Sequence, residues 1–358
     1  MGRPTHKVTF LPQGRDVFVL DGTGLVEAAG RANMPLEQPC GGTGTCGKCR
    51  VEVREGCDEP SAAERKLLDE EDLERGVRLA CQTEVHRDMV VFVPDESRLF
   101  ELEALTEGVG RAYDLDPNVR KRTVSTDEFE AAGTTSYADR LKGELSTQDI
   151  RMSVQAARDL SPVIMSEREQ ATAVLRGDEV VAIEGGDNSR DIWGAAFDIG
   201  TTSLAGVLVN LADGSEAAVT GRTNPQSHYG DDVVNRINYV QQNEDGLETL
   251  HGRIIDSMNE MLAEMADTAG IDTGSIYEVV AVGNTTMSHL LLSVDPTPLA
   301  HAPYLAVIRE EAEVPADELG LQVADRARLY ALPNIAGFVG SDTVAVVLAT
   351  GMARSDEI

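Results

Sequence analysis

Short alternations of apolar and polar residues predict a small β-rich unit at the start of the chain. Apolar positions alternate with polar ones on both sides of the turn Gln13-Gly14-Arg15, so we expect a hairpin over 6–21. A short helix should follow over 25–33, because Pro35 cannot continue it. The remaining elements expected here are strands at 50–54, 77–85 and 89–93 and one polar helical stretch at 61–75. The pattern therefore predicts the order strand, strand, helix, strand, strand.

The pattern weakens between residues 96 and 118, which we interpret as a linker that ends near Asp116-Pro117. Residues 119–190 follow as a small α+β unit. Its expected elements are helices near 137–145 and 154–160 and two apolar strands, 171–175 and 180–183, around the turn Arg176-Gly177-Asp178. Nothing in the sequence of this stretch indicates a catalytic or binding role.

Long apolar strands separated by tight turns begin after Trp193 and predict an α/β unit over 191–358. Its longest helix is expected over 247–268, where apolar residues recur every three or four positions and mark one buried stripe. We interpret the methionines of this stripe as core residues rather than a ligand surface. The other expected elements are strands at 194–199, 204–211, 217–220, 277–282 and 329–334 and helices at 232–241, 284–293 and 341–350.

The chain has 358 residues and a strongly acidic balance, with 31 basic against 61 acidic residues and a formal net charge of −30. Such a charge repels phosphate backbones and anionic lipids, which argues against nucleic acid or membrane surfaces as partners. Because 42% of the residues are hydrophobic, the acidic residues must lie on folded surfaces. Lysine is scarce, and we interpret this surface as that of a halophilic archaeon with a salty cytoplasm. An ordinary acidic protein is the alternative.

No stretch approaches the roughly 20 apolar residues of a membrane span. The longest apolar run, Thr343–Met352, has ten residues, and the first ten residues of the chain lack the apolar core of a secretory signal. The five cysteines, none of which follows Cys81, do not resemble a secreted disulfide framework. We therefore expect a cytoplasmic protein without a membrane span.

Four of the cysteines form a metal-binding pattern. Cys40, Cys46 and Cys49 have the spacing C-x5-C-x2-C, and Cys81 follows later in the chain. Four thiolates are the usual ligand set of an iron–sulfur cluster, and the glycines between them suit a loop that wraps a cluster, namely Gly41, Gly42, Gly44 and Gly47. The alternative is a four-cysteine zinc site, which usually needs two C-x2-C pairs where this chain has one. Cys57 lies outside the pattern, and we interpret it as apolar filler rather than a replacement ligand.

The cysteine spacing is one residue longer than the plant-type C-x4-C-x2-C and matches the adrenodoxin-like variant. Together with the expected order of strands and helix, which is that of a β-grasp domain, residues 1–95 resemble a 2Fe-2S ferredoxin. The resemblance implies a one-electron donor or relay.

A second motif, Asp198-Ile-Gly-Thr-Thr-Ser203, lies between two expected strands. A turn of Gly200, Thr201 and Thr202 can direct consecutive amides at a phosphate, while Asp198 at the strand end can hold a hydrated magnesium ion. A plain hairpin turn is the alternative for these residues.

This motif resembles the first phosphate loop of the actin-like (ASKHA) ATPase superfamily. Three further stretches, 224–236, 283–287 and 336–343, look like signatures of one branch of it, the reductive activators of corrinoid proteins. The resemblance covers essentially the whole chain. It implies a mixed α+β and α/β multidomain protein, with a β-grasp 2Fe-2S ferredoxin at 1–95, a linker at 96–118, a middle α+β domain at 119–190 and the N-terminal half of an actin-like, ribonuclease H-like ATPase domain at 191–358.

The resemblance also implies a function. Such proteins use ATP to return an oxidised Co(II) corrinoid to Co(I) in methyltransferase systems, so the implied partners are a corrinoid protein or methyltransferase and an upstream electron donor. The cluster would be held by Cys40, Cys46, Cys49 and Cys81. Mg-ATP would lie against Asp198, Gly200, Thr201, Thr202 and Ser203.

Five other residues match positions of the family motifs: Asp232, Arg236, Asn284, Thr285 and Asp342. Facing the nucleotide is one possible role for them. For Asn284 and Asp342, helix capping is an equally good interpretation.

The chain departs from the family pattern in one respect. The second half of an actin-like ATPase carries another D-x-G-T loop and the adenosine pocket, and neither occurs in this sequence. Since a ligand site of this kind needs both walls, we expect weak or absent ATP binding by this chain alone and an exposed apolar face near the last helix. The alternative function is a ferredoxin-type electron carrier without ATPase activity, whose half actin-like domain is a docking module.

Overall fold

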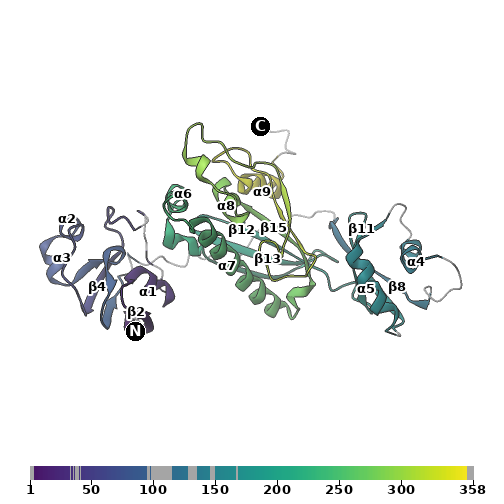
Figure 1. The fold of residues 1–358 in the computed structure, drawn as a ribbon, viewed down its shortest axis with the longest axis horizontal. Coiled ribbons are helices and arrows are strands. Elements are labelled where there is room, and N and C mark those ends of the chain that lie inside the picture. Colours follow the sequence, from purple (N-terminus) through teal and green to yellow (C-terminus); the bar gives the residue numbers. More distant parts are fainter. Residues whose placement is uncertain are drawn as a thin grey trace.

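The computed structural model describes residues 4–32, 34, 36, 40, 42–94, 97, 115–127, 135–145, 150–166 and 168–352. Gly41 and most of the expected linker at 96–118 lie outside the described residues. In Figure 1 the chain forms three domains, and the third in sequence lies between the first and the second.

The first domain is a five-stranded sheet in the order β2-β1-β7-β4-β5, with α1 (Leu25–Arg31) packed against it. Strands β1 and β7 are parallel, and the other neighbours are antiparallel. The expected hairpin, first helix and strand order are confirmed. The strands are β1 (Thr5–Leu11), β2 (Arg15–Leu20), β4 (Arg50–Glu55), β5 (Val77–Leu79) and β7 (Met89–Phe92), with the short pair β3 (Thr23–Gly24) and β6 (Glu84–Val85) beside them.

Two expectations for this domain are wrong in detail. The helical stretch at 61–75 is two short helices, α2 (Glu64–Leu67) and α3 (Glu70–Glu74), because Leu68 is extended and Asp69 caps α3 with its carboxylate. The strand expected over 77–85 is interrupted by the 3₁₀ turn η1 (Ala80–Gln82). This turn carries Cys81 out of the sheet and toward the loop that holds the other cysteines.

The second domain is a four-stranded sheet in the order β8-β10-β11-β9, with α5 (Val154–Ile164) packed on β11. The expected α4 (Tyr137–Glu144), α5, β10 (Gln170–Arg176) and β11 (Glu179–Gly185) are confirmed. Two edge strands were not expected, β8 (Val119–Ser125) and β9 (Arg151–Met152). Strand β8 carries three basic residues in succession, which conceal its strand pattern.

The third domain is a six-stranded sheet in the order β14-β13-β12-β15-β17-β16, with α7 (Gly246–Ala269) packed on β13 and β14. The expected stripe of α7 is buried from Leu250 to Met265 and contacts the sheet core, whereas Leu247 is only partly buried. The strands are β12 (Trp193–Ile199), β13 (Ser203–Asn210), β14 (Glu216–Thr223), β15 (Ile276–Gly283), β16 (Ala312–Pro315) and β17 (Arg328–Ala331), of which only β16 was not expected.

Strands β12, β15 and β17 are parallel, so their carboxyl ends meet at one edge of the sheet. The turn 200–202 follows β12 at this edge, α8 (Thr285–Leu291) begins just after β15, and α9 (Ser341–Thr350) begins after β17. On the way to α6 (Val233–Gln242), the 3₁₀ turn η4 (Pro225–Tyr229) follows β14. The topology therefore gathers the motif residues of this domain at one edge.

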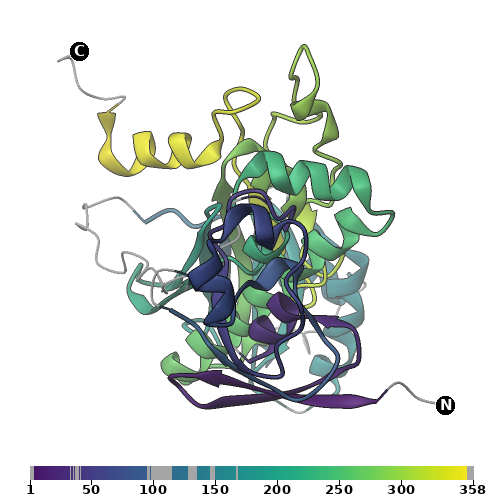
Figure 2. The same ribbon diagram turned by 90° about the vertical axis from the view of Figure 1, so that its left-hand side faces the viewer.

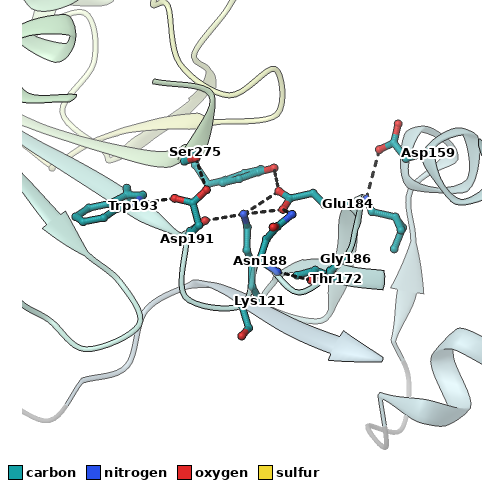
Figure 3. Close-up of polar contacts among 12 residues, drawn as sticks. Lys121, Asp159, Thr172, Glu184, Gly186, Asn188, Asp191, Trp193 and Ser275 are labelled. Carbon is teal, nitrogen blue, oxygen red and sulfur yellow. Dashed lines mark hydrogen bonds and ion pairs between the residues drawn. The ribbon is translucent and has the colours of Figure 1, made fainter. Parts of the chain in front are cut away.

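The second and third domains are joined by a buried polar junction (Figure 3). The Lys121 ammonium, on a side chain that is 1% exposed, lies 2.8 Å from Glu184 Oε1 and donates to the carbonyl of Asp191 at 2.6 Å. The Tyr277 hydroxyl donates to the same carboxylate at 2.6 Å, and Ser275 donates to Asp191 Oδ2 at 2.8 Å. Lys121 and Glu184 belong to the second domain and Asp191 and Tyr277 to the third, so the Lys121–Asp191 and Tyr277–Glu184 bonds fix the two domains to each other.

No helix in the described part of the chain is long and apolar enough to cross a membrane. Helix α9 lies at the margin of the third domain (Figure 2), and Val346, Leu348 and Met352 at its end are exposed. The apolar surface expected near the last helix is therefore present.

Candidate functional site

The structure brings the four cysteines of the motif together as two contacting pairs. Cys40, Cys46 and Cys49 lie on the loop between α1 and β4, and Cys81 lies on η1. The thiols of Cys40 and Cys46 are in hydrogen-bonding contact, and so are those of Cys49 and Cys81. Among the described residues, no three or more His, Cys, Asp or Glu side chains gather around a single point as ligands of one ion. The thiols thus lie as two pairs rather than as one compact tetrad.

Backbone amides of the loop surround these sulfur atoms. Partial burial acts to raise the pKa of Cys40, but the amides of Thr45 and Cys46 and the hydroxyl of Thr43 outweigh it and lower that pKa to about 6. Burial raises the pKa of Cys46, against a donor amide from Lys48. The N–H donors of this loop thus stabilise the anionic form of Cys40, whereas burial outweighs them at Cys46.

The second pair shares its charge unequally. The contact with Cys81 and then burial raise the pKa of Cys49, which is 1% exposed. Contact with Cys49 lowers the pKa of Cys81, against burial, and the Gln82 carboxamide and the Gly44 amide lower it further. In each pair, therefore, the surroundings lower the pKa of one cysteine and raise that of the other.

Cys57 lies apart from these pairs, in the segment after β4. Its side chain packs against the core of the first domain, its thiol donates to the carbonyl of Asp58 at 3.5 Å, and burial raises its pKa. These contacts agree with its interpretation as apolar filler.

The second candidate site is the turn after β12, whose carbonyls are fixed from behind. The Asn224 side chain donates to the carbonyl of Gly200 at 2.7 Å and its backbone amide donates to that of Thr202 at 2.8 Å, while Arg236 donates to the carbonyl of Thr201. In a planar trans peptide the next amide points away from the carbonyl. The amides of Thr201 and Thr202 are therefore directed to the side opposite these donors, as in an anion-binding nest.

Arg236 is completely buried beneath this turn and does not face the open edge. Its guanidinium also donates to the carbonyl of Gly230 at 2.8 Å and to Gln226 Oε1 at 3.0 Å. Burial lowers its pKa to about 10, against the attraction of nearby carboxylates. The role considered from the sequence was to face the nucleotide, whereas the structure places Arg236 as a brace behind the turn.

The helix start after β15 adds a contact to the turn. Asn284 caps α8 by accepting from the amide of Met287 at 3.1 Å, and its Nδ2 donates to Thr201 Oγ1 at 2.9 Å. Thr285 is buried and donates to the carbonyl of Ala336 at 2.6 Å. Asn284 thus combines the capping role with a contact to the turn.

The start of α9 approaches the same edge, through residues that sequence reasoning missed. Ser341 Oγ accepts from the amide of Gly283 and donates to its carbonyl, both at 3.0 Å. A Cβ atom at Gly340 would lie 2.3 Å from that carbonyl, so only glycine fits there. The signal was present in the sequence as a Gly-Ser pair at the start of an expected helix.

Asp198 and Asp342 lie close enough at this edge for their charges to interact. Crowding by the surrounding chain and then the neighbouring Asp342 raise the pKa of Asp198, although its side chain keeps contact with solvent. Asp342 also accepts from the amide of Thr343 at 2.7 Å in the first turn of α9. Asp232 has a different role, since its carboxylate caps α6 by accepting from the amide of Asn235 at 2.8 Å.

An open cleft of about 1530 Å³ separates the first domain from the third. Gly42 and Cys81 of the cysteine site line one side, and His228 and Arg253 line the other. The two domains approach each other where α1 lies near η4. The Cys81 side of the cysteine site is thus accessible from this cleft.

Comparison with known proteins places each domain. Residues 8–86 match the 2Fe-2S iron-sulfur cluster binding domain, residues 108–190 the RACo linker region and residues 193–355 the RACo middle region. The chain is 28% identical over 327 residues to the corrinoid activation enzyme RamQ of Eubacterium limosum, which covers 91% of this chain and 52% of that protein. It is also 41% identical over 58 residues to a component of the Na(+)-translocating NADH-quinone reductase of Chlamydia felis, covering 16% of this chain and 14% of that component.

A solved structure, the reductive activator for corrinoid, iron-sulfur protein, matches with a TM-score of 0.64 and 31% identity over 99% of this chain and 59% of its own. The chain spans about half the length of the curated relative RamQ. The first domain binds a 2Fe-2S cluster, since its family model, its cysteine set and this structural match agree. The chain belongs to the family of reductive activators of corrinoid proteins.

Proposed function

We propose that this chain passes single electrons from the cluster of its first domain to a corrinoid partner, reducing Co(II) to Co(I), and that ATP at its third domain drives this transfer. The proposal rests mainly on the four cysteines, which lie as two pairs, receive N–H donors and border an open cleft. The match to family members whose names refer to corrinoid activation supplies the partner class.

The ligand assignment follows from the pairing. Cys40 and Cys46 hold one iron and Cys49 and Cys81 the other, because a dinuclear cluster takes two protein ligands on each iron. A zinc ion would require all four thiolates around one centre. When bound, the cluster takes up and releases one electron. The chain contributes the four thiolates and the loop amides that stabilise negative charge on sulfur.

The electron balance is simple. The four cysteines would hold the cluster, which would supply one-electron transfer: one electron from an upstream donor of low potential would convert one Co(II) of the partner to Co(I). No proton or group transfer is needed. The cleft beside Gly42 and Cys81 gives the partner access to the cysteine site.

The third domain supplies one wall of a nucleotide site and is the first half of an actin-like ATPase domain. Thr201 and Thr202 amides receive phosphate together with Gly200 and Ser203, and Asp198 with Asp342 holds a hydrated magnesium ion. Support comes from the braced turn and from the two interacting carboxylates, which a divalent cation would neutralise. We propose that a second half of the domain supplies the opposite wall, packed near the exposed apolar residues of α9.

The acidic surface suits a cytoplasm of high salt, where repulsion among 61 acidic side chains is screened.

The deciding experiment is anaerobic purification, followed by absorption and EPR spectra and assays of iron and sulfide. A 2Fe-2S spectrum supports the proposal, and a colourless zinc-loaded protein contradicts it. The reduced protein is then mixed with a purified corrinoid protein in the Co(II) state, with and without Mg-ATP, and the Co(I) absorption is recorded. Cobalt that stays Co(II) under all conditions contradicts the partner assignment.

The alternative, an electron carrier without ATPase activity, is separated by calorimetry and by completing the domain. We expect Mg-ATP to bind weakly to this chain alone and to accelerate Co(I) formation once the C-terminal half of a family member is added. Tight binding by this chain alone would contradict the need for a second wall. Electron transfer that ignores ATP in the completed protein would favour the carrier.

A further inference from the structure

Gln82 connects the two segments that carry the cysteines. It follows Cys81 at the end of η1, and its Nε2 lies 3.7 Å from Cys81 Sγ. The same nitrogen donates to the carbonyls of Gly42 at 3.0 Å and Cys81 at 3.2 Å. One carboxamide therefore reaches both the sulfur of one cysteine and the backbone of the loop that carries the other three.

The loop is shaped to admit this carboxamide. A Cβ atom at Gly44 would lie 2.7 Å from Gln82 Cδ and 3.0 Å from its Nε2, and Gly44 has a φ of +70°. The space that a side chain at position 44 would need is occupied by the carboxamide. The glycine and the glutamine thus fit each other, and the donor cannot be displaced by a larger loop residue.

We propose that Gln82 is a positioning residue that raises the reduction potential of the cluster by donating its side-chain N–H to the sulfur of Cys81. Reduction adds negative charge that the cluster shares with its sulfur ligands, so an N–H donor stabilises the reduced state more than the oxidised state. The inference rests on the proposed function only in that Cys81 is a cluster ligand. The hydrogen bond from Gln82 Nε2 to the Gly42 carbonyl holds the carboxamide in place.

The test is the midpoint potential of the Gln82→Leu variant, measured by EPR-monitored redox titration of the full chain. Leucine keeps the branched shape beside Gly44 but has no donor. We expect a shift of about tenfold in the equilibrium with a fixed mediator, toward the oxidised cluster, which is about 59 mV for one electron. Gln82→Glu, which replaces the donor by a carboxylate, should shift it further in the same direction. An unchanged potential in Gln82→Leu with full iron and sulfide content overturns the proposal.

Thr83→Val is the matched control. Thr83 follows Gln82, and its hydroxyl donates to the carbonyl of Leu79 at 3.0 Å rather than to sulfur. Its potential should equal that of the parent protein. An equal shift in this variant would contradict a specific role for Gln82.

A purely structural role for Gln82 predicts a different result, namely loss of cluster content with a parent-like potential in the molecules that keep the cluster. If Gln82→Leu loses the cluster entirely, pulsed EPR of the reduced parent protein decides. Isotopic labelling of glutamine side-chain nitrogen should reveal a hyperfine coupling to the cluster, and its absence overturns the proposal. A parent protein without any cluster would instead contradict the proposed function itself.

Discussion

Two glycine-containing loops carry the candidate sites of this chain, one whose amides donate to cysteine sulfur and one proposed to receive phosphate, and they are supported in different ways. The cysteine loop of the first domain contains its own donors to Cys40 and Cys46, since the amides of Thr45, Cys46 and Lys48 lie within a few residues of these sulfurs. The turn after β12 is short, and its carbonyls are fixed by Asn224 and Arg236 from other segments. The first site is built locally, and the second depends on the packing of a whole domain.

The two sites should therefore be sensitive to substitutions at different places. Changing a residue in the cysteine loop acts directly on the bound group. The turn after β12, in contrast, can be disabled from residues that never touch a ligand. The following substitutions test this contrast, beginning with the largest expected effect.

Removing one ligand of the local site should abolish its cofactor. We expect Cys46→Ser to lose the 2Fe-2S absorption and EPR signals, because Cys40 then has no partner thiolate. The matched control is Cys57→Ser, which lies outside the pairs and should keep its full iron and sulfide content. Equal loss in both variants would mean that Cys57 takes part in binding.

Removing the Arg236 brace of the second site should lower the stability of the third domain. We expect Arg236→Met to lower the free energy of unfolding by about 3 kcal/mol, because the carbonyls of Thr201 and Gly230 and the side chain of Gln226 lose a buried donor. Trp193, the only tryptophan of the chain, lies in β12 and reports the transition by fluorescence. Arg236→Lys keeps the charge with fewer donors, so its stability should lie between those of the parent protein and Arg236→Met. A parent-like stability of Arg236→Met would refute the bracing role.

The junction between the second and third domains should show a smaller effect. Lys121→Met leaves the Glu184 carboxylate without its cation, and we expect a loss of about 2 kcal/mol in the same assay. The loss is limited because Glu184 is 22% exposed and keeps bonds from Asn188 and Tyr277. The control is Arg151→Met, which breaks an ion pair of similar length, 3.0 Å, whose side chains are 70% and 64% exposed. That variant should show no measurable change, and a loss equal to that of Lys121→Met would remove the distinction.

Salt should screen the repulsion between acidic side chains over the whole surface, so its effect on any single contact is the smallest considered. We expect the melting temperature of the full chain to rise by about 5 °C or more between low and molar KCl, the shift that about 2 kcal/mol of screened repulsion produces. Circular dichroism measures the melt, and KNO3 at equal ionic strength serves as the control for specific ion effects. A melting temperature that does not respond to salt would contradict the halophilic interpretation.

The contrast between local and distant support also explains which features could be predicted from the sequence. The cysteines, their spacing and the Asp198 motif are short patterns, so the two sites and most of the elements around them could be predicted. Helix α7 was predictable because its stripe is regular over many turns. The strand β8 was not, because Lys121 appears as a surface residue until the fold buries its ammonium against Glu184.

The supporting residues of the second site were harder to predict for the same physical reason. Arg236 matches a family motif, but only the tertiary structure shows that it lies behind the turn rather than at its open side. Ser341 gave a signal only as a helix start, since its bonds to Gly283 join segments 58 residues apart. Gln82 gave none, because a glutamine after a cysteine has no spacing to recognise.

The polar junction around Lys121 also decides where this protein can be divided. A cut near residue 190 would expose the Lys121 ammonium and the Glu184 carboxylate to water on one fragment and leave the Tyr277 hydroxyl without its acceptor on the other. A cut between 94 and 115 severs no such contact among the described residues. Domain exchange with other iron–sulfur modules should therefore treat residues 115–352 as a single cassette, and the first domain as the interchangeable part.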